Sequence, residues 1–128
     1  VTSKTFEGEN VNKKSIHDIL ENEMILDACL EKEVISLIHS AKTILWNGPM
    51  GVFENIHFEE GTRELAKAIA KSEAFSIAGG GETLSAINKY IKSDDVSYCS
   101  TGGGAFLEFM EGKVLPSIEV LNSKEIGR

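Results

Sequence analysis

Cysteine, proline and long apolar runs are all scarce in this chain. Its 128 residues include two cysteines, two prolines and three histidines. Cys29 and Cys99 are too few for the disulfide framework of a small secreted domain, so we expect reduced thiols in a cytoplasmic protein. No apolar run is long enough to span a membrane, and the first five residues lack the apolar core of a signal peptide. The histidines lack metal-ligand spacing.

Basic residues are also in deficit. Lysine and arginine number 13 against 20 acidic residues, which gives a formal net charge of −7. This balance argues against nucleic acid as a partner, because that role calls for a basic face. It does not exclude a nucleotide, since a helix N-terminus binds phosphate without net positive charge. With 41% apolar and 26% charged residues, the chain has the composition of one globular domain.

What the chain does have is a repeated unit of strand, glycine-rich turn and helix. The predicted strands are 43–46, 74–78 and 96–99, and the turns that follow them are 47–51, 79–81 and 100–104. Apolar residues at helical spacing predict helices over 31–40, 59–72, 82–91 and 105–110, with Glu59 and Arg63 paired across one turn. Strands that alternate with helices predict an α/β fold, in which a parallel sheet is joined by right-handed crossovers. All three turns then lie at the carboxyl edge of the sheet, where such folds bind ligands.

The turn at residues 79–83 has the composition of a phosphate site. Gly79, Gly80 and Gly81 let the backbone approach an anion, and the helix that follows directs its N–H groups at the same place. The carboxylate of Glu82 would repel a phosphate unless a cation lay between them, and Mg²⁺ is bound in this way. The alternative is that Glu82 is a solvated residue that favours the helix dipole.

The other two turns suggest different contacts. Residues 100–105 offer consecutive glycine N–H groups to an anion, or else form a tight turn without a ligand. Residues 47–54 combine turn residues with apolar residues that would line a pocket for a flat ring. The carboxylate of Glu54 would accept hydrogen bonds from ribose hydroxyls. The alternative for this loop is core packing with an exposed Glu54. The candidate wall residues are Trp46, Met50, Val52 and Phe53.

Several common signatures are missing, and one absence is informative. Neither glycine triplet completes G-x-G-x-x-G, and no G-x-x-x-x-G-K-[ST] motif occurs. None of the three loops contains lysine or arginine, although phosphoryl transfer needs positive charge around the transferred group. If these loops serve phosphoryl transfer, the cationic side chains come from residues outside this chain.

In these same loops the sequence resembles phosphoglycerate kinase. The matching stretches are 44–54, 75–83, 100–108 and 111–116, in the order and spacing of the family. The resemblance implies a partial Rossmann-like domain over residues 1–128, with a three-layer parallel sheet. It corresponds to the last part of the nucleotide-binding C-terminal domain, and residues 116–128 form a tail that returns toward the N-terminal domain.

The resemblance also implies roles for individual residues. Asn47, Pro49, Gly51 and Val52 would line the adenosine site, and Glu54 would contact the ribose. ADP or ATP phosphates and Mg²⁺ would be held by Gly80, Gly81, Glu82 and Thr83, with Glu82 as the metal ligand. The N–H groups donated to the transferred phosphoryl would come from Gly102, Gly103 and Gly104. Glu82 departs from the family pattern, which usually has aspartate there.

The implied reaction moves a phosphoryl group between 1,3-bisphosphoglycerate and ADP, giving 3-phosphoglycerate and ATP. The phosphoglycerate would bind through the missing N-terminal domain, so we expect the chain alone to be inactive and the full-length protein to be a monomer. Two other functions stay open at this stage. One is a nucleotide- or anion-binding module without catalysis, and the other is a fragment that self-associates through an unprotected sheet edge.

Overall fold

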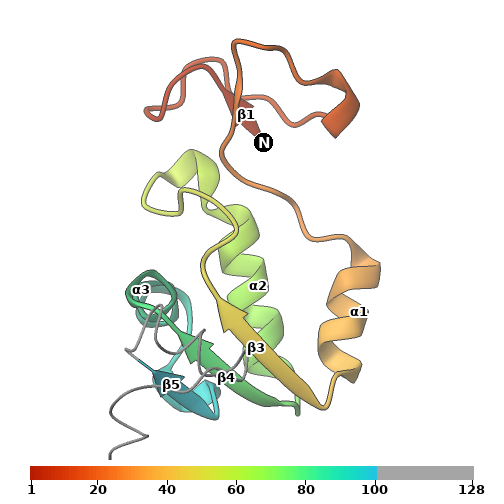
Figure 1. The fold of residues 1–128 in the computed structure, drawn as a ribbon, viewed down its shortest axis with the longest axis vertical. Coiled ribbons are helices and arrows are strands. Elements are labelled where there is room, and N and C mark those ends of the chain that lie inside the picture. Colours follow the sequence, from red (N-terminus) through yellow and green to blue (C-terminus); the bar gives the residue numbers. More distant parts are fainter. Residues whose placement is uncertain (101–128) are drawn as a thin grey trace, which may run out of the picture.

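The computed structural model describes residues 1–100, which form a parallel sheet with helices and a separate N-terminal segment (Figure 1). Residues 101–128, which include the predicted helix 105–110 and the tail 116–128, lie outside the described residues. The sheet has the order β3-β4-β5, and both pairs of neighbouring strands are parallel. Its strands are β3 (Thr43–Asn47), β4 (Phe75–Gly79) and β5 (Tyr98–Ser100). The predicted α/β architecture is confirmed.

Three α-helices alternate with these strands, as the sequence predicts. Apolar periodicity favours all three helices. The helices are α1 (Lys32–Ser40), α2 (Glu60–Lys71) and α3 (Gly81–Tyr90), within two residues of the predicted bounds. Helices α2 and α3 each bury an apolar stripe, whereas α1 has no fully buried residue and only its Ile35 and Ile38 are half-buried. The predicted pair is also present, with Arg63 Nη1 at 3.2 Å from Glu59 Oε1. No helix within residues 1–100 is both long and apolar enough to cross a membrane.

Strand β5 begins two residues later than predicted. A 3₁₀ helix, η3 (Ser93–Asp95), occupies the turn before it, and the Asp95 carboxylate accepts the N–H of Lys92 at 3.0 Å. Val96 follows directly, and its side chain is buried. Its N–H donates to Ser93 O within the turn, and strand pairing starts only at Tyr98. Two further 3₁₀ helices, which the sequence does not predict, are η1 (Ile16–Asp18) and η2 (Ile56–Phe58).

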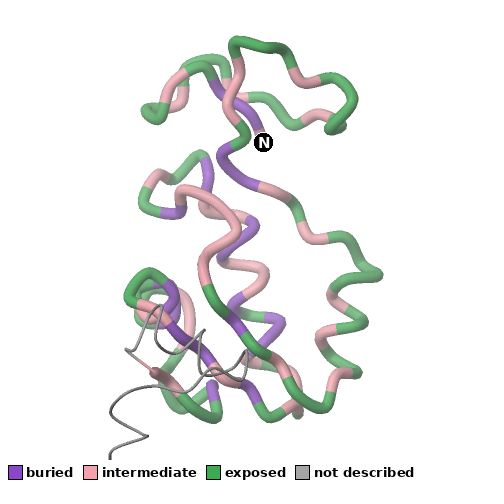
Figure 2. The backbone as a smooth tube through the Cα atoms, in the orientation of Figure 1, coloured by how far each residue is buried: buried purple, intermediate pink, exposed green. Residues whose placement is uncertain are grey.

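The N-terminal segment contains a two-stranded antiparallel ribbon. It pairs β1 (Thr2–Ser3) with β2 (Met24–Ile25). The buried segment Leu26–Asp27 then connects the ribbon to the rest of the chain, and Figure 2 shows this segment as a buried stretch. It lies against the loop after β3, because Val52 N–H donates to Leu26 O at 2.9 Å.

The core lies between one face of the sheet and the helices. Residues alternate between the two faces of a strand, so the register assigns each of them to a face. Trp46 and Ala78 are buried on the helix-covered face with α2 and α3, and Ile38 of α1 packs against the same cluster. Leu45 and Tyr98 lie on the opposite face and are 44% and 57% exposed. The described residues thus form two of the three expected layers.

Candidate functional site

The three predicted loops begin at one edge of the sheet. The register aligns Asn47 with Gly79 and Gly79 with Ser100, so the three strands end side by side. Because the strands are parallel, this is the carboxyl edge for all of them. Gly80 N–H donates to Ser100 O at 3.2 Å, which holds the second loop against the end of β5. The carboxyl ends of β3, β4 and β5 therefore meet at one edge, as the sequence predicts.

The N-terminus of α3 opens onto this edge. Gly80 precedes the helix with φ 93°, a left-handed conformation that glycine adopts without a Cβ penalty. Within residues 1–100 no side chain caps α3, so its first N–H groups have no side-chain acceptor in the part of the chain that the structure describes. Gly81 is exposed, and a Cβ built there would meet nothing within 4 Å. Consecutive backbone N–H groups and the positive end of the helix dipole are the features with which helix N-termini bind anions.

Glu82 is the one carboxylate in the first turn of α3. It is exposed and makes no ion pair with any residue in the described part of the chain. No group of three or more metal-ligating side chains occurs within residues 1–100. The donor set therefore fits a cation that takes one carboxylate and completes its shell with phosphate oxygens and water, as Mg²⁺ does.

Thr83 has a second role that the sequence does not reveal. Its side chain is buried, and its hydroxyl oxygen accepts the N–H of Gly48 at 2.7 Å. This bond joins the start of the first loop to the start of α3 across 35 residues of sequence. The side chain of Asn47 lies in the same place, with Oδ1 at 3.4 Å from a Cβ built on Gly80. The predicted adenosine loop and the predicted phosphate loop are therefore neighbours.

The loop after β3 is fixed by its backbone. The buried Thr62 accepts the N–H groups of Met50 at 3.1 Å and Gly51 at 3.3 Å. Gly51 also packs so closely that a Cβ there would meet Leu26 O and would lie 2.7 Å from Asp27 Cα. Pro49, Gly51 and Val52, all predicted to line the adenosine site, are half-buried on this loop, whereas Asn47 and Glu54 are exposed.

Two of the four residues proposed as walls for a flat ring lie in the core. Trp46 and Phe53 are each 4% exposed and belong to the same buried cluster as Ile69 and Ile87. The indole N–H of Trp46 donates to Gly48 O at 2.8 Å, so this side chain supports the loop from beneath. Trp46 and Phe53 therefore pack in the core, and Glu54 is exposed, as the alternative interpretation of this loop expects. Met50 and Val52 are half-buried.

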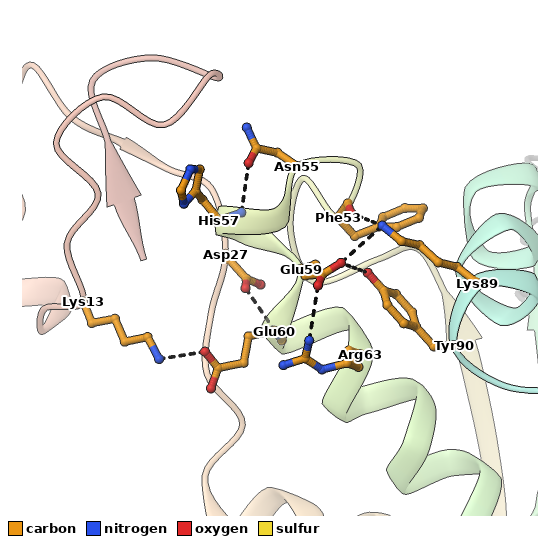
Figure 3. A network of polar contacts seen from close by, with 11 residues as sticks. Lys13, Asp27, Phe53, Asn55, His57, Glu59, Glu60, Arg63, Lys89 and Tyr90 are labelled. Carbon is orange, nitrogen blue, oxygen red and sulfur yellow. Dashed lines mark hydrogen bonds and ion pairs between the residues drawn. The ribbon is translucent and has the colours of Figure 1, made fainter.

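Apart from the Glu59–Arg63 pair, sequence reasoning missed the residues that hold the loop and the N-terminus of α2 in place. Asp27 is 2% exposed, and its Oδ2 accepts the N–H of Gly61 at 3.0 Å, at the N-terminus of α2. A carboxylate at a helix N-terminus also interacts favourably with the positive end of the helix dipole. The other support is a polar network around Glu59, drawn in Figure 3, with Arg63, Lys89 and Tyr90. Asp27 and Gly61 are 34 residues apart, and no sequence pattern signals the pair.

The described loops at the sheet edge carry no basic side chain, as the sequence predicts. Within 47–54 and 79–83 there is no lysine or arginine, and the cations Arg63 and Lys89 are both engaged by the Glu59 carboxylate. Hydrogen bonds from Tyr90 and Lys89 hold the pKa of Glu59 below its usual range, so that carboxylate stays charged.

A hollow of about 530 Å³ lies away from the sheet edge. It is lined by N-terminal residues such as Lys13 and Ile16, and by none of the predicted site residues. Gly102, Gly103 and Gly104 lie outside the described residues.

Comparison with known proteins identifies the family of this chain. The family model described as phosphoglycerate kinase matches residues 1–113. Phosphoglycerate kinases of Francisella tularensis and Francisella philomiragia are 57% and 56% identical to this chain, over 88% and 87% of its length. The chain spans 29% of each of those relatives.

Solved structures of phosphoglycerate kinases also match this chain in fold. The phosphoglycerate kinase of Coxiella burnetii matches with a TM-score of 0.84 and 45% identity, over 96% of this chain and 32% of that one. The enzyme of Pyrococcus horikoshii matches with a TM-score of 0.66 and 42% identity, over 78% of this chain and 25% of that one. The matching fold, the order of the glycine loops and the family model lead to one conclusion: the chain belongs to the phosphoglycerate kinase family.

Proposed function

We propose that this chain forms the nucleotide side of a phosphoglycerate kinase, which transfers a phosphoryl group between 1,3-bisphosphoglycerate and ADP in glycolysis. The observation that carries the proposal is the alignment of the loops after β3 and β4 at one sheet edge, beside the N-terminus of α3, which no side chain of the described residues caps. Such an edge offers backbone donors to phosphate and a loop surface to the nucleoside. ADP or ATP is therefore the expected ligand.

The phosphate end of the nucleotide belongs at α3. The N–H groups of Gly81 and Glu82 and the positive end of the helix dipole would face the phosphates. Glu82 would hold Mg²⁺, whose charge offsets the repulsion between the carboxylate and the phosphates. Thr83 would contribute from the same turn, with its oxygen already bound to the N–H of Gly48. Gly102, Gly103 and Gly104 are proposed as donors to the transferred phosphoryl group.

The nucleoside end belongs on the loop after β3. Asn47, Pro49, Gly51 and Val52 are proposed to contact adenosine, and the exposed Glu54 to accept from the ribose. Because Thr62, Thr83 and Leu26 fix this loop through backbone hydrogen bonds, its surface is organised before the nucleotide arrives. Such preorganisation lowers the entropic cost of binding.

The second substrate and the cations would come from the rest of the full-length protein. Phosphoryl transfer needs positive charge near the transferred group, and residues 47–54, 79–83 and 100–105 contain no lysine or arginine. We therefore expect the 128-residue chain to be inactive alone in a coupled assay for ATP formation from 1,3-bisphosphoglycerate and ADP. Turnover by the purified chain would overturn this expectation.

The binding proposal is tested by calorimetry with Mg-ADP on the full-length protein. Gly80→Ala forces a Cβ onto a residue with φ 93°, next to Asn47 Oδ1, and should weaken binding. Gly8→Ala is the control for backbone strain away from the site, because Gly8 has a similar φ of 101° in the N-terminal segment, where the added Cβ would also press on the His57 ring. Equal Mg-ADP affinity in the two variants would contradict the proposal. Binding without any phosphoryl transfer, either from 1,3-bisphosphoglycerate to ADP or from ATP to 3-phosphoglycerate, would instead indicate a non-catalytic module.

A further inference from the structure

The carboxylate of Glu59 joins the start of α2 to the end of α3. Arg63 Nη1 lies 3.2 Å from Glu59 Oε1, Lys89 Nζ lies 3.2 Å from Oε2, and the Tyr90 hydroxyl donates to Oε2 at 2.9 Å. Figure 3 shows Glu59 between the Arg63 side chain on one side and the Lys89 and Tyr90 side chains on the other. The Glu59 side chain is 18% exposed, whereas those of Arg63 and Lys89 are 40% and 42% exposed, so the carboxylate is the shielded partner of both ion pairs.

Lys89 makes a further contact that leads to the predicted nucleoside loop. Its Nζ donates to the main-chain oxygen of Phe53 at 2.9 Å and lies 5.7 Å from the centre of the Phe53 ring. The Tyr90 ring packs edge-on against the same phenyl ring, with centroids 6.3 Å apart. Phe53 is thus held through both its backbone and its side chain by two consecutive residues of α3, and Glu59 fixes the position of both.

The held carbonyl controls the residue that follows. The Phe53 oxygen and the Glu54 nitrogen belong to one planar peptide unit, so the hydrogen bond to the oxygen sets the orientation of the peptide plane that leads into Glu54. On the other side, Val52 N–H is already bonded to Leu26 O at 2.9 Å. The position of the segment 52–54 is therefore determined from both ends, and the α3 end depends on the Lys89 ammonium.

We propose that Lys89 is a positioning residue for the nucleoside end of the site. It acts through the Phe53 carbonyl on Val52 and Glu54, and it does not itself touch the nucleotide. Glu59 and Tyr90 serve the same purpose by holding the Lys89 side chain in place. This inference rests on the proposed function, because it assumes that adenosine lies on the loop after β3.

The test separates the two ends of the ligand. Calorimetry on the full-length protein would compare Mg-ADP, which reaches both ends, with Mg-pyrophosphate, which reaches the phosphate end alone. Lys89→Met should weaken Mg-ADP binding by about ten- to a hundredfold, the scale of the one charged hydrogen bond that holds the Phe53 oxygen, and leave Mg-pyrophosphate binding unchanged. Lys89→Arg, which keeps a donor for the Phe53 oxygen, should recover most of the affinity. Lys67→Met removes an exposed lysine of α2 and should match the wild type.

Each result decides a different question. Unchanged Mg-ADP affinity in Lys89→Met, or equal loss for Mg-ADP and Mg-pyrophosphate, would overturn the positioning role, since equal loss indicates a general change in the fold. An equal effect in Lys67→Met would overturn it too, because net charge would then explain the loss. Failure of the wild-type protein to bind either ligand would refute the proposed function itself, and the positioning role with it.

Discussion

Replacing Thr62 with valine removes the acceptor that fixes the middle of the loop after β3. Thr62 is fully buried in the first turn of α2, and its hydroxyl oxygen receives the N–H groups of Met50 at 3.1 Å and Gly51 at 3.3 Å. Valine has nearly the same shape, so the substitution creates no large cavity. Its effect is to leave two backbone donors without their partner.

The magnitude follows from the two bonds. Removing the acceptor from a shielded N–H costs about 1–3 kcal/mol. The Met50 bond has ordinary length, whereas the Gly51 bond is slightly longer than usual, and both residues are half-buried and accessible to water. We therefore expect a total near the middle of that range, about 2 kcal/mol, which corresponds to roughly 30-fold more frequent opening of the loop.

Hydrogen exchange followed by mass spectrometry on peptides covering residues 47–53 measures this opening. Thr62→Ser is the control, because it keeps the acceptor and loses one methyl group, worth about 1 kcal/mol. Exchange in this peptide should be fast in Thr62→Val and close to wild type in Thr62→Ser. If the two variants exchanged equally fast, packing of the methyl group would be the cause. If Thr62→Val matched the wild type, the hydrogen bonds would not hold the loop.

Three more predictions concern the metal, the Glu59 network and Gly51. Glu82→Gln should lower Mg-ADP affinity by about tenfold or more in calorimetry while Glu82→Asp keeps most of it, and equal affinities would exclude Glu82 as a metal ligand. Hydrogen bonds from Tyr90 and Lys89 lower the pKa of Glu59, so its stabilisation is present above the unfolded pKa of about 4.3 and is lost as the pH falls through the lower folded value. The urea midpoint of the wild type should therefore exceed that of Glu59→Gln at pH 7 and approach it near pH 3, and a constant gap would refute the charge-based explanation. Gly51→Ala should destabilise the fold by about 1–3 kcal/mol in thermal denaturation, because its Cβ meets backbone atoms that cannot move aside, whereas Gly81→Ala, with open space around it, should not.

Contacts close in sequence were predictable. Glu59 and Arg63 are one helical turn apart, so their pairing follows from the spacing alone. The glycine turns likewise mark the strand ends, because a parallel α/β sheet brings consecutive strands to a common edge. Strand β5 is the exception. Its start depends on the 3₁₀ turn closed by Asp95, a detail that apolar patterning does not encode.

The role of the aromatic residues was not predictable in this way. Trp46 and Phe53 suit either a ring-binding wall or a core, and both roles call for the same residue types. The register places Trp46 on the helix-covered face beside Ala78, and the packing of α3 encloses Phe53. The structure therefore assigns both to the core, where they support the loop and do not line its surface.

The sequence by itself determined the alternation of strands and helices, the common edge of the glycine loops and the absence of basic residues from them. These features depend on local backbone preference, on apolar periodicity and on composition, all of which can be read along the chain. The tertiary structure alone decided how the loops are held. The contacts of Thr83 with Gly48, of Glu59 with Tyr90 and of Lys89 with Phe53 join residues 31 to 36 positions apart. Such contacts exist only after helices and strands pack, because packing brings together side chains that no local pattern relates.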